Sequence, residues 1–277
     1  MMRIIAWLLQ ATWVGVLLCP NFVVGQDLPR QHHPWGRFHP DSWKQVRVLN
    51  ETLSPDGAVM LRGVSETTTR LVSVDAEGYT LKVDVVVDVD GKRFASPSQT
   101  IWHGYFGQRP GQTVQVKKTG DTQLTVAGKR TICEQRTVVI SDAQQRRTAQ
   151  IAYSPDVSPF TLRREVTTAD DTKIISEVVA FDHDVDVLGV HRPTSKVKTV
   201  ATLGKNSLST IETMCDDVPG GVVSHSSQET DEQGRVIRRS TLELLSYEAV
   251  ECPQPGDTVV RRRSYSRREA RRDARRD

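Results

Sequence analysis

Glu177 and Glu243 are the residues of this 277-residue chain whose placement first suggests chemistry. They hold matching positions in two similar stretches, and paired carboxylates serve as acid and base in glycosidases. Duplication offers a simpler explanation, because a repeated unit copies a residue whether or not chemistry needs it. We predict that both glutamates are structural, at a strand end or beside an arginine, and that the chain has no catalytic residue.

Other arrangements that could support catalysis or metal binding are incomplete. Ser154, Ser158 and Ser224 lack the Gly-x-Ser-x-Gly elbow of serine hydrolases, and the sequence has no phosphate-binding glycine loop. Residues 182–186 (Asp-His-Asp-Val-Asp), with His191 further on, offer alternate carboxylates for calcium or zinc. They lack the ligand number and the glycine of a calcium loop. We predict a solvated acidic connector here, and neither a metal nor a cofactor.

Residues 26–43 form a leader in which three histidines, His32, His33 and His39, lie beside aromatic residues. Three prolines and a glycine argue against a rigid element that could hold a metal, and the histidine spacing matches no helical or strand face. We predict an extended lead-in whose aromatic side chains pack across the open end or the edge of a sheet.

Residues 101–107 place Trp102, His103, Tyr105 and Phe106 beside two glycines. Glycines permit close approach and aromatic rings supply contact area, so one interpretation is a loop that contacts a ligand or a partner. The other interpretation, which we favour, is a connection between two sections of sheet whose aromatic side chains fill the core.

Alternating residues and turn signals predict the elements that must carry these side chains. In residues 81–89, Leu and Val alternate with Lys and Asp, which is typical of a strand with one buried and one wet face. No helical pattern of similar quality occurs in the folded body. Further strands, separated by turns of the Asp-Gly kind, are predicted at residues 46–52, 59–74, 92–95, 113–116, 123–126 and 132–140.

Residues 151–182 and 213–248 follow the same plan. In both, a strand stops at an Asp-Val with a proline close behind (SPDVSP and DDVPGG), an extended run follows, and the stretch closes on EVVAF or ELLSY. We predict a mainly β protein, an antiparallel curved sheet or half-barrel built from meandering hairpins with a duplicated unit. The β domain is predicted at 44–260, with repeat units at 123–182 and 196–248.

Residues 1–25 are predicted to be an export signal. Arg3 precedes an apolar run (4–18), and small or β-branched residues precede a cut at Gln26. A membrane-spanning helix is the alternative, but the run is shorter than the roughly 20 apolar residues that a bilayer requires. Lipid attachment at Cys19 is disfavoured by the bulky Leu18 before it. We expect a periplasmic or extracellular protein with no transmembrane segment in the mature chain.

Cys133, Cys215 and Cys252 remain after the export signal is removed. An odd number prevents complete pairing, and without a CxxC spacing neither a zinc site nor a thioredoxin-like motif is indicated. The candidate disulfide joins Cys215 to Cys252, and the alternative is a set of buried, unpaired thiols.

Residues 261–277 form a low-complexity tail with nine arginines and three acids, in a chain whose net charge is +3. The tail has too few apolar residues to bury, so we predict disorder. Its charge suits an anionic surface such as lipid headgroups or acidic polymers, and a solvated tail without a partner is the alternative. Export and the single Tyr265 argue against nucleic acid. The arginines are Arg261, Arg262, Arg263, Arg267, Arg268, Arg271, Arg272, Arg275 and Arg276.

The two landmark motifs, SPDVSP and DDVPGG with the runs that follow them, resemble those of exported bacterial proteins with a LolA-like curved sheet. The opening WGRFHPDSWKQVRVLNETL is similar to uncharacterised secreted proteins of planctomycete-type bacteria. The resemblance covers at best residues 42–248. It implies an antiparallel half-barrel wrapped around an apolar ligand such as a lipid chain, and it brings no catalytic residues. The first copy departs from the pattern because it has no Gly-Gly.

These observations predict a non-enzymatic exported module of the cell envelope that holds an apolar ligand, such as a lipid, or a protein partner on the concave side of its sheet. The alternative is a structural or scaffold protein that acts through its basic tail and its sheet edges. A hydrolase is a third and less favoured possibility.

Overall fold

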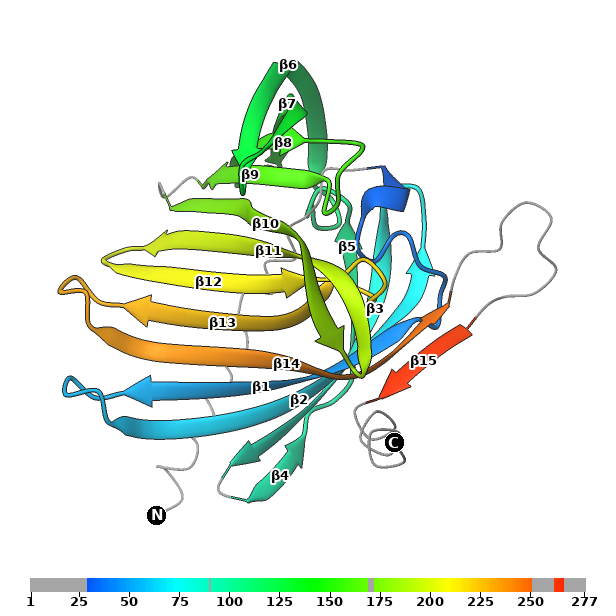
Figure 1. Ribbon diagram of the computed structural model, residues 1–277. Coiled ribbons are helices and arrows are strands. Elements are labelled where there is room, and N and C mark those ends of the chain that lie inside the picture. Colours follow the sequence, from blue (N-terminus) through cyan, green and yellow to red (C-terminus); the bar gives the residue numbers. More distant parts are fainter. Residues whose placement is uncertain (1–28, 90, 169–171, 251–261, 267–277) are drawn as a thin grey trace.

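The computed structural model describes residues 29–89, 91–168, 172–250 and 262–266, and most of them belong to one antiparallel sheet (Figure 1). The predicted export signal lies outside the described residues. Within them there is no α-helix, and one 3-10 turn, η1 (Arg30–His32), precedes the sheet. The strands are β1 (Trp43–Leu53), β2 (Val59–Val74), β3 (Gly78–Val89), β4 (Lys92–Ala95), β5 (Gln99–Gly104), β6 (Thr113–Val126), β7 (Lys129–Ser141), β8 (Arg146–Tyr153), β9 (Thr161–Thr167), β10 (Lys173–Val187), β11 (Val190–Leu203), β12 (Asn206–Met214), β13 (Val222–Thr230), β14 (Val236–Val250) and β15 (Arg262–Ser266).

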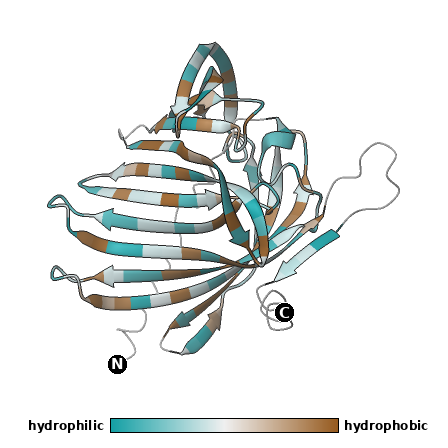
Figure 2. Cartoon of the chain, in the orientation of Figure 1, coloured by the Kyte–Doolittle hydropathy of each residue, from teal (hydrophilic) through white to brown (hydrophobic). Residues whose placement is uncertain are grey.

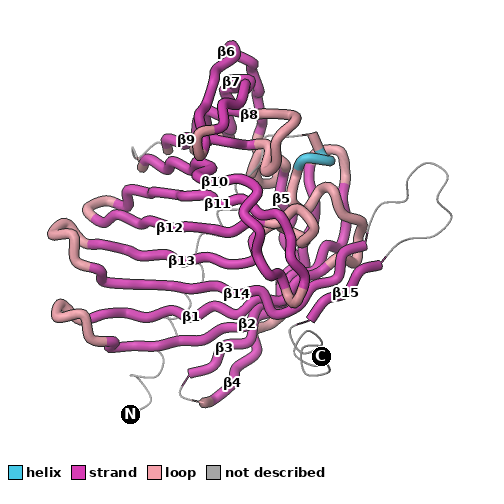
Figure 3. The backbone as a smooth tube through the Cα atoms, viewed as in Figure 1, coloured by secondary structure: helices cyan, strands magenta, loops and turns pink. Residues whose placement is uncertain are grey.

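The strand order is β4-β3-β2-β1-β14-β13-β12-β11-β10-β9-β8-β7-β6, with β15 added to β14 and β5 added to β3. From β6 to β14 each strand pairs with the next one along the chain, so this part is a meander of hairpins. Turns and loops are confined to the strand ends (Figure 3). The predicted class, a mainly β protein with an antiparallel curved sheet, is confirmed.

The duplicated unit is visible in two turns with the same hydrogen bonds. In the β8–β9 turn, the Ser154 amide donates to the Phe160 carbonyl at 2.8 Å, and in the β12–β13 turn the Cys215 amide donates to the Gly221 carbonyl at 2.8 Å. Phe160 and Gly221 both have a positive φ, 68° and 72°. The two SPDV and DDVP landmarks therefore form equivalent turns, although only the second has a glycine at the position with positive φ.

One face of the curved sheet carries the core. Leu81 of β3 and Val223 of β13 belong to the same buried cluster as Val46 and Leu244, although β2, β1 and β14 separate β3 from β13 in the sheet. The sheet must therefore curve around these side chains, and we call this side the inner face. The alternate residues of the same strands point to the outer face, and Figure 2 shows the resulting alternation of polar and apolar positions.

Three sequence predictions are corrected by the strands. The segment predicted as an acidic connector is hairpin backbone, because β10 runs to Val187 and β11 starts at Val190. The strands predicted at 113–116 and 123–126 are one strand, β6, with a register shift between Lys118 and Gly120. The tail is not structureless throughout, because Arg262–Ser266 form β15. Pairing with β14 satisfies the backbone hydrogen bonds of this segment, although the segment has few apolar side chains to bury.

Candidate functional site

A row of hydroxyl side chains crosses the inner face of five neighbouring strands. Cross-strand pairing aligns Ser176 with Thr199, Thr199 with Thr210, Thr210 with Ser227, and Ser227 with Ser240. Ser176 and Thr199 share a hydrogen bond of 2.9 Å, and so do Thr210 and Ser227. We call these five residues the hydroxyl row. It makes the middle of the inner face polar where a filled core would be apolar.

A second row beside it is apolar. Pairing aligns Leu208 with Ala201, Ala201 with Ile174, and Ile174 with Val166. Ala201 is buried, whereas Leu208, Ile174 and Val166 keep partial solvent exposure. We call these four residues the apolar row. Partly exposed apolar side chains on a concave face are typical of a surface that accepts a ligand or a partner.

Three ionisable side chains are recessed on the inner face on the other side of the hydroxyl row. Glu212 of β12 and His225 of β13 are direct cross-strand neighbours, and Lys44 projects from the start of β1. Each keeps partial contact with solvent. Protein atoms nevertheless surround them closely enough that burial dominates their titration. Partial contact with solvent together with close packing by protein atoms is expected for side chains deep in a concave surface.

Burial shifts all three pKa values toward the neutral forms. It raises the pKa of Glu212 to about 7, with the Lys44 charge acting in the opposite direction. It lowers the pKa of Lys44 to about 8, with Glu212 opposing the shift, and it lowers the pKa of His225 to about 4. Near neutral pH the imidazole is therefore uncharged, and its Nε2 lies 3.3 Å from the Ser240 hydroxyl. Perturbed titration in a cleft is a common mark of a functional site.

The leader covers one end of the inner face and contacts both repeated turns. The His32 ring stacks on Phe160 of the first turn, with centroids 4.0 Å apart. In the second turn the Gly220 amide donates to the Pro34 carbonyl at 3.1 Å. Arg37 joins the two turns, because it lies over the Phe160 ring and pairs with Asp216 at 3.2 Å.

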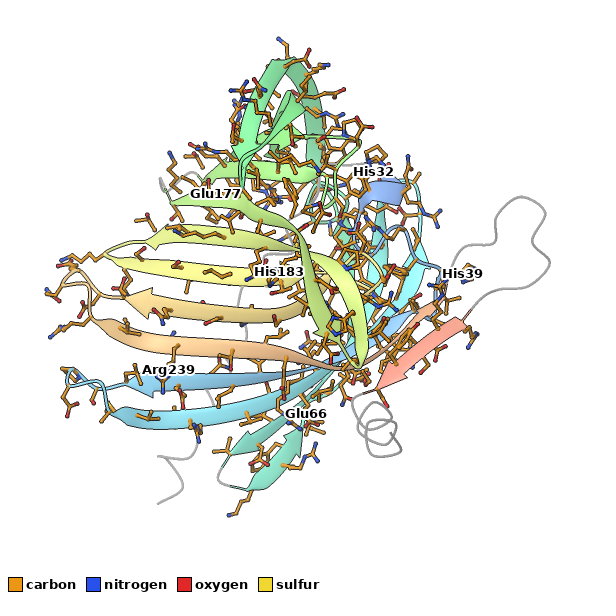
Figure 4. All side chains as sticks on the ribbon, viewed as in Figure 1. His32, His39, Glu66, Glu177, His183 and Arg239 are labelled. Carbon is orange, nitrogen blue, oxygen red and sulfur yellow. The ribbon has the colours of Figure 1, made fainter. Side chains whose placement is uncertain are left out.

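Aromatic side chains of the leader are buried, as predicted. Trp35 is 3% exposed and Phe38 is 5% exposed, and both belong to the main core cluster. Figure 4 labels two of the three leader histidines, His32 and His39. Among the described residues no group of three or more His, Cys, Asp or Glu side chains could hold a metal ion.

The aromatic residues after β3 contact other parts of the protein. Tyr105 is buried and donates its hydroxyl proton to the Asp75 carbonyl at 3.0 Å, while the Trp102 indole donates to the Asp75 carboxylate at 3.2 Å. His103 stacks on Tyr79. Phe106 packs between two core clusters. Core filling accounts for Tyr105 and Phe106, whereas Trp102 and His103 lie in β5 and belong to none of the core clusters. A role of the four residues in ligand contact stays a prediction.

Glu177 and Glu243 do not converge. They lie on the outer face of β10 and β14, and the three strands between them imply a separation of roughly 19 Å at about 4.8 Å per strand. Glu243 pairs with Arg47 at 3.3 Å, which confirms the predicted arginine partner. Glu177 lies opposite Lys198 and Arg163 in the register. An acid and base pair formed by these two residues is therefore not supported.

The other predicted sites lie at the surface or outside the described residues. Asp184 pairs with His191 at 3.1 Å in an exposed position. Cys133 and Cys215 are buried and form no disulfide with another described cysteine. Cys252 lies outside the described residues, so the pairing of Cys215 with Cys252 stays a prediction. Of the tail arginines, Arg262 pairs with Glu248 at 3.4 Å. Arg263 lies in β15, and the remaining seven lie outside the described residues.

Sequence reasoning missed Lys44, Glu212, His225 and the hydroxyl row. Strand alternation places Thr210 on the same face as Glu212 and Ser227 on the same face as His225, but the hydroxyl residues of the runs SLSTIET and VVSHSSQET occur on both faces. The sequence does not show the register of the strands, and the pairing of five strands decides which hydroxyls meet.

No protein-family model matches this chain, and no curated protein matches it significantly. Among solved structures it is similar to a candidate lipoprotein from Parabacteroides distasonis, with 11% sequence identity and a TM-score of 0.29. It is also similar to a candidate exported protein with a YmcC-like fold from Bacteroides fragilis, with 11% identity and a TM-score of 0.27. Each alignment covers 75% of this chain and 98% of the other. Both come from Bacteroides-type bacteria rather than planctomycetes, and neither bears the LolA name.

Proposed function

We propose that this protein is a non-enzymatic, exported component of the cell envelope that holds a ligand with an extended apolar part on the inner face of its sheet. The observation that carries the proposal is the apolar row, in which three of the four side chains stay partly exposed on a concave surface next to recessed polar groups. Export is supported by the charged and apolar pattern of residues 1–25.

The two glutamates considered as an acid and base pair do not meet. Glu177 and Glu243 lie on the outer face, far from each other. Among the described residues no helix is long and apolar enough to cross a membrane. A binding module would hold its ligand by burying apolar surface, worth about 25 cal/mol per Å² removed from water.

Native mass spectrometry of the protein purified from its own envelope, followed by organic extraction, tests the proposal. We expect one apolar or amphiphilic molecule per chain. A bare polypeptide at its calculated mass, with nothing released on denaturation, would contradict the proposal and favour a scaffold acting through the tail and the sheet edges.

A pair of substitutions on one strand locates the ligand. Leu208→Asn alters the apolar row, whereas Ile211→Asn alters a side chain on the outer face of the same strand that is 47% exposed. Losing the contact of one buried leucine costs about 1.5–3 kcal/mol, so we expect at least tenfold weaker retention of the extracted molecule for Leu208→Asn. Equal retention by the two variants would place the ligand elsewhere.

A further inference from the structure

Lys44 is a recessed cation without a carboxylate partner. Its ammonium donates to the Val222 carbonyl at 3.3 Å and lies 5.8 Å from the centre of the Trp35 ring. Within the described part of the chain no carboxylate reaches ion-pair distance of its Nζ atom. A carbonyl and an aromatic face leave part of the donor capacity of an ammonium group unused, because it carries three N–H bonds.

Glu212 is a recessed acid that also lacks an ion-pair partner among the described residues. In the described ranges its carboxyl group forms neither a hydrogen bond nor an ion pair, although it interacts electrostatically with Lys44 from a longer distance. Buried charges are normally paired, because removing them from water is unfavourable. Lys44 and Glu212 are close enough to interact electrostatically, and neither forms an ion pair with another described residue.

We infer that the ligand of the inner face carries a carboxylate head group, which binds between Lys44 and Glu212 while its apolar part extends past the hydroxyl row to the apolar row. This inference rests on the proposed function and adds the chemical class of the ligand. A carboxylate can accept from the Lys44 ammonium on one side and from the protonated Glu212 carboxyl on the other. A protonated Glu212 and a neutral His225 add no negative charge that would repel it.

The groups around this position fit the assignment. Lys44 is flanked in the sheet by Tyr247 of β14 and Thr69 of β2, and the leader contributes Trp35. Glu212 is flanked by His225 and by Val197. The titratable groups facing the head group are therefore Lys44, Glu212, His225 and Tyr247. Burial raises the pKa of the Tyr247 hydroxyl, so it stays neutral.

Calorimetric titration of the delipidated full chain tests the head group. Three probes share a twelve-carbon chain, namely dodecanoate, dodecanol and dodecyl phosphate, all used below their aggregation concentrations. We expect dodecanoate to bind at least tenfold more tightly than dodecanol at pH 6.5, and Lys44→Met to abolish that preference. Lys198→Met is the matched control, because Lys198 is exposed on the outer face of β11, and it should change the affinity less than twofold.

The variant Glu212→Gln tests the pH dependence of dodecanoate binding. Ionisation of Glu212 above pH 7 places a negative charge beside the head group, so dodecanoate should bind more weakly at pH 8.5 than at pH 6.5. In Glu212→Gln this loss should be smaller, with the remainder due to deprotonation of Lys44. Thermal unfolding of each variant establishes that it is folded.

The outcomes separate this inference from the proposed function. If no probe binds the wild-type protein, the proposed function fails. If dodecanol and dodecanoate bind equally and Lys44→Met changes nothing, the apolar site stands and the head-group inference is overturned. Tighter, Lys44-dependent binding of dodecyl phosphate than of dodecanoate would overturn the carboxylate assignment in favour of a phosphate head group.

Discussion

At the scale of single residues, His33 shows how the leader is held. Its ring is fully buried, and its Nδ1 atom accepts hydrogen bonds from the amides of Trp35 and Gly36, both at 3.2 Å. Nδ1 must therefore be unprotonated, and Nε2 carries the proton without a hydrogen-bond partner among the described residues. Burial and the nearby Arg37 lower the pKa of His33 to about 3.

This histidine should make folding stability depend on pH. The pKa of His33 lies below its unfolded value of 6.5, so the folded state binds fewer protons and its stability is complete only above pH 6.5. Stability is lost as the pH falls from 6.5 toward 3, by up to about 1.4 kcal/mol per pH unit for this one group. We expect His33→Asn, which keeps an acceptor for the two amides, to flatten the dependence between pH 7.5 and 5 in urea unfolding.

Three partly buried histidines also contribute to the pH dependence of folding stability. The pKa values of His32, His103 and His225 are also lowered, mainly by burial, so the wild-type slope contains several contributions. The comparison is therefore the difference in slope between wild type and His33→Asn. Identical slopes would show that His33 is not neutral and buried as the structure has it.

At the scale of elements, the leader and the β12–β13 turn depend on each other. Gly220 has a φ of 74°, and a Cβ atom there would lie 2.6 Å from Nε1 of Trp35. Gly234 in the β13–β14 turn has a φ of 75°, but a Cβ atom there would have no neighbour within 4 Å. Alanine at Gly234 therefore introduces backbone strain alone, whereas alanine at Gly220 introduces the same strain and a clash with the leader.

Alanine at these two positions should give different losses of stability. Gly234→Ala should cost only the left-handed backbone penalty, about 1–2 kcal/mol. Gly220→Ala should cost at least twice as much, because Trp35 must also move out of its place in the core. Urea unfolding with both variants measures the difference. Equal losses would mean that the leader does not rest on this turn.

At the scale of the whole molecule, the curved sheet divides the protein into two chemically distinct surfaces. The inner face carries the hydroxyl and apolar rows with Lys44 and Glu212. The outer face carries ion pairs such as Arg47–Glu66 at 2.9 Å. The described part of the arginine tail, Arg262–Ser266, pairs along the end of β14, where Tyr265 packs against the same core cluster as the leader.

Removing the tail tests the predicted anionic partner. A chain that ends at Ser266 keeps β15 and loses six arginines and three acids. If the tail docks to anionic lipid, the shortened chain should bind vesicles containing phosphatidylglycerol several-fold more weakly, and the difference should shrink in high salt. Vesicles of phosphatidylcholine are the control. Equal binding of both chains to anionic vesicles would contradict a docking role.

Local patterns in the sequence determined the β class, most strand positions, the repeated turns and the burial of the leader aromatics. These features follow from alternation, turn residues and composition, which act over a few residues. The site itself depended on tertiary structure. Lys44 and Glu212 are far apart in the chain, and Ser176 meets Thr199 only through the register of the sheet. Strand pairing and curvature bring such residues together, and neither is encoded in the spacing of neighbouring residues, so only the folded structure could decide them.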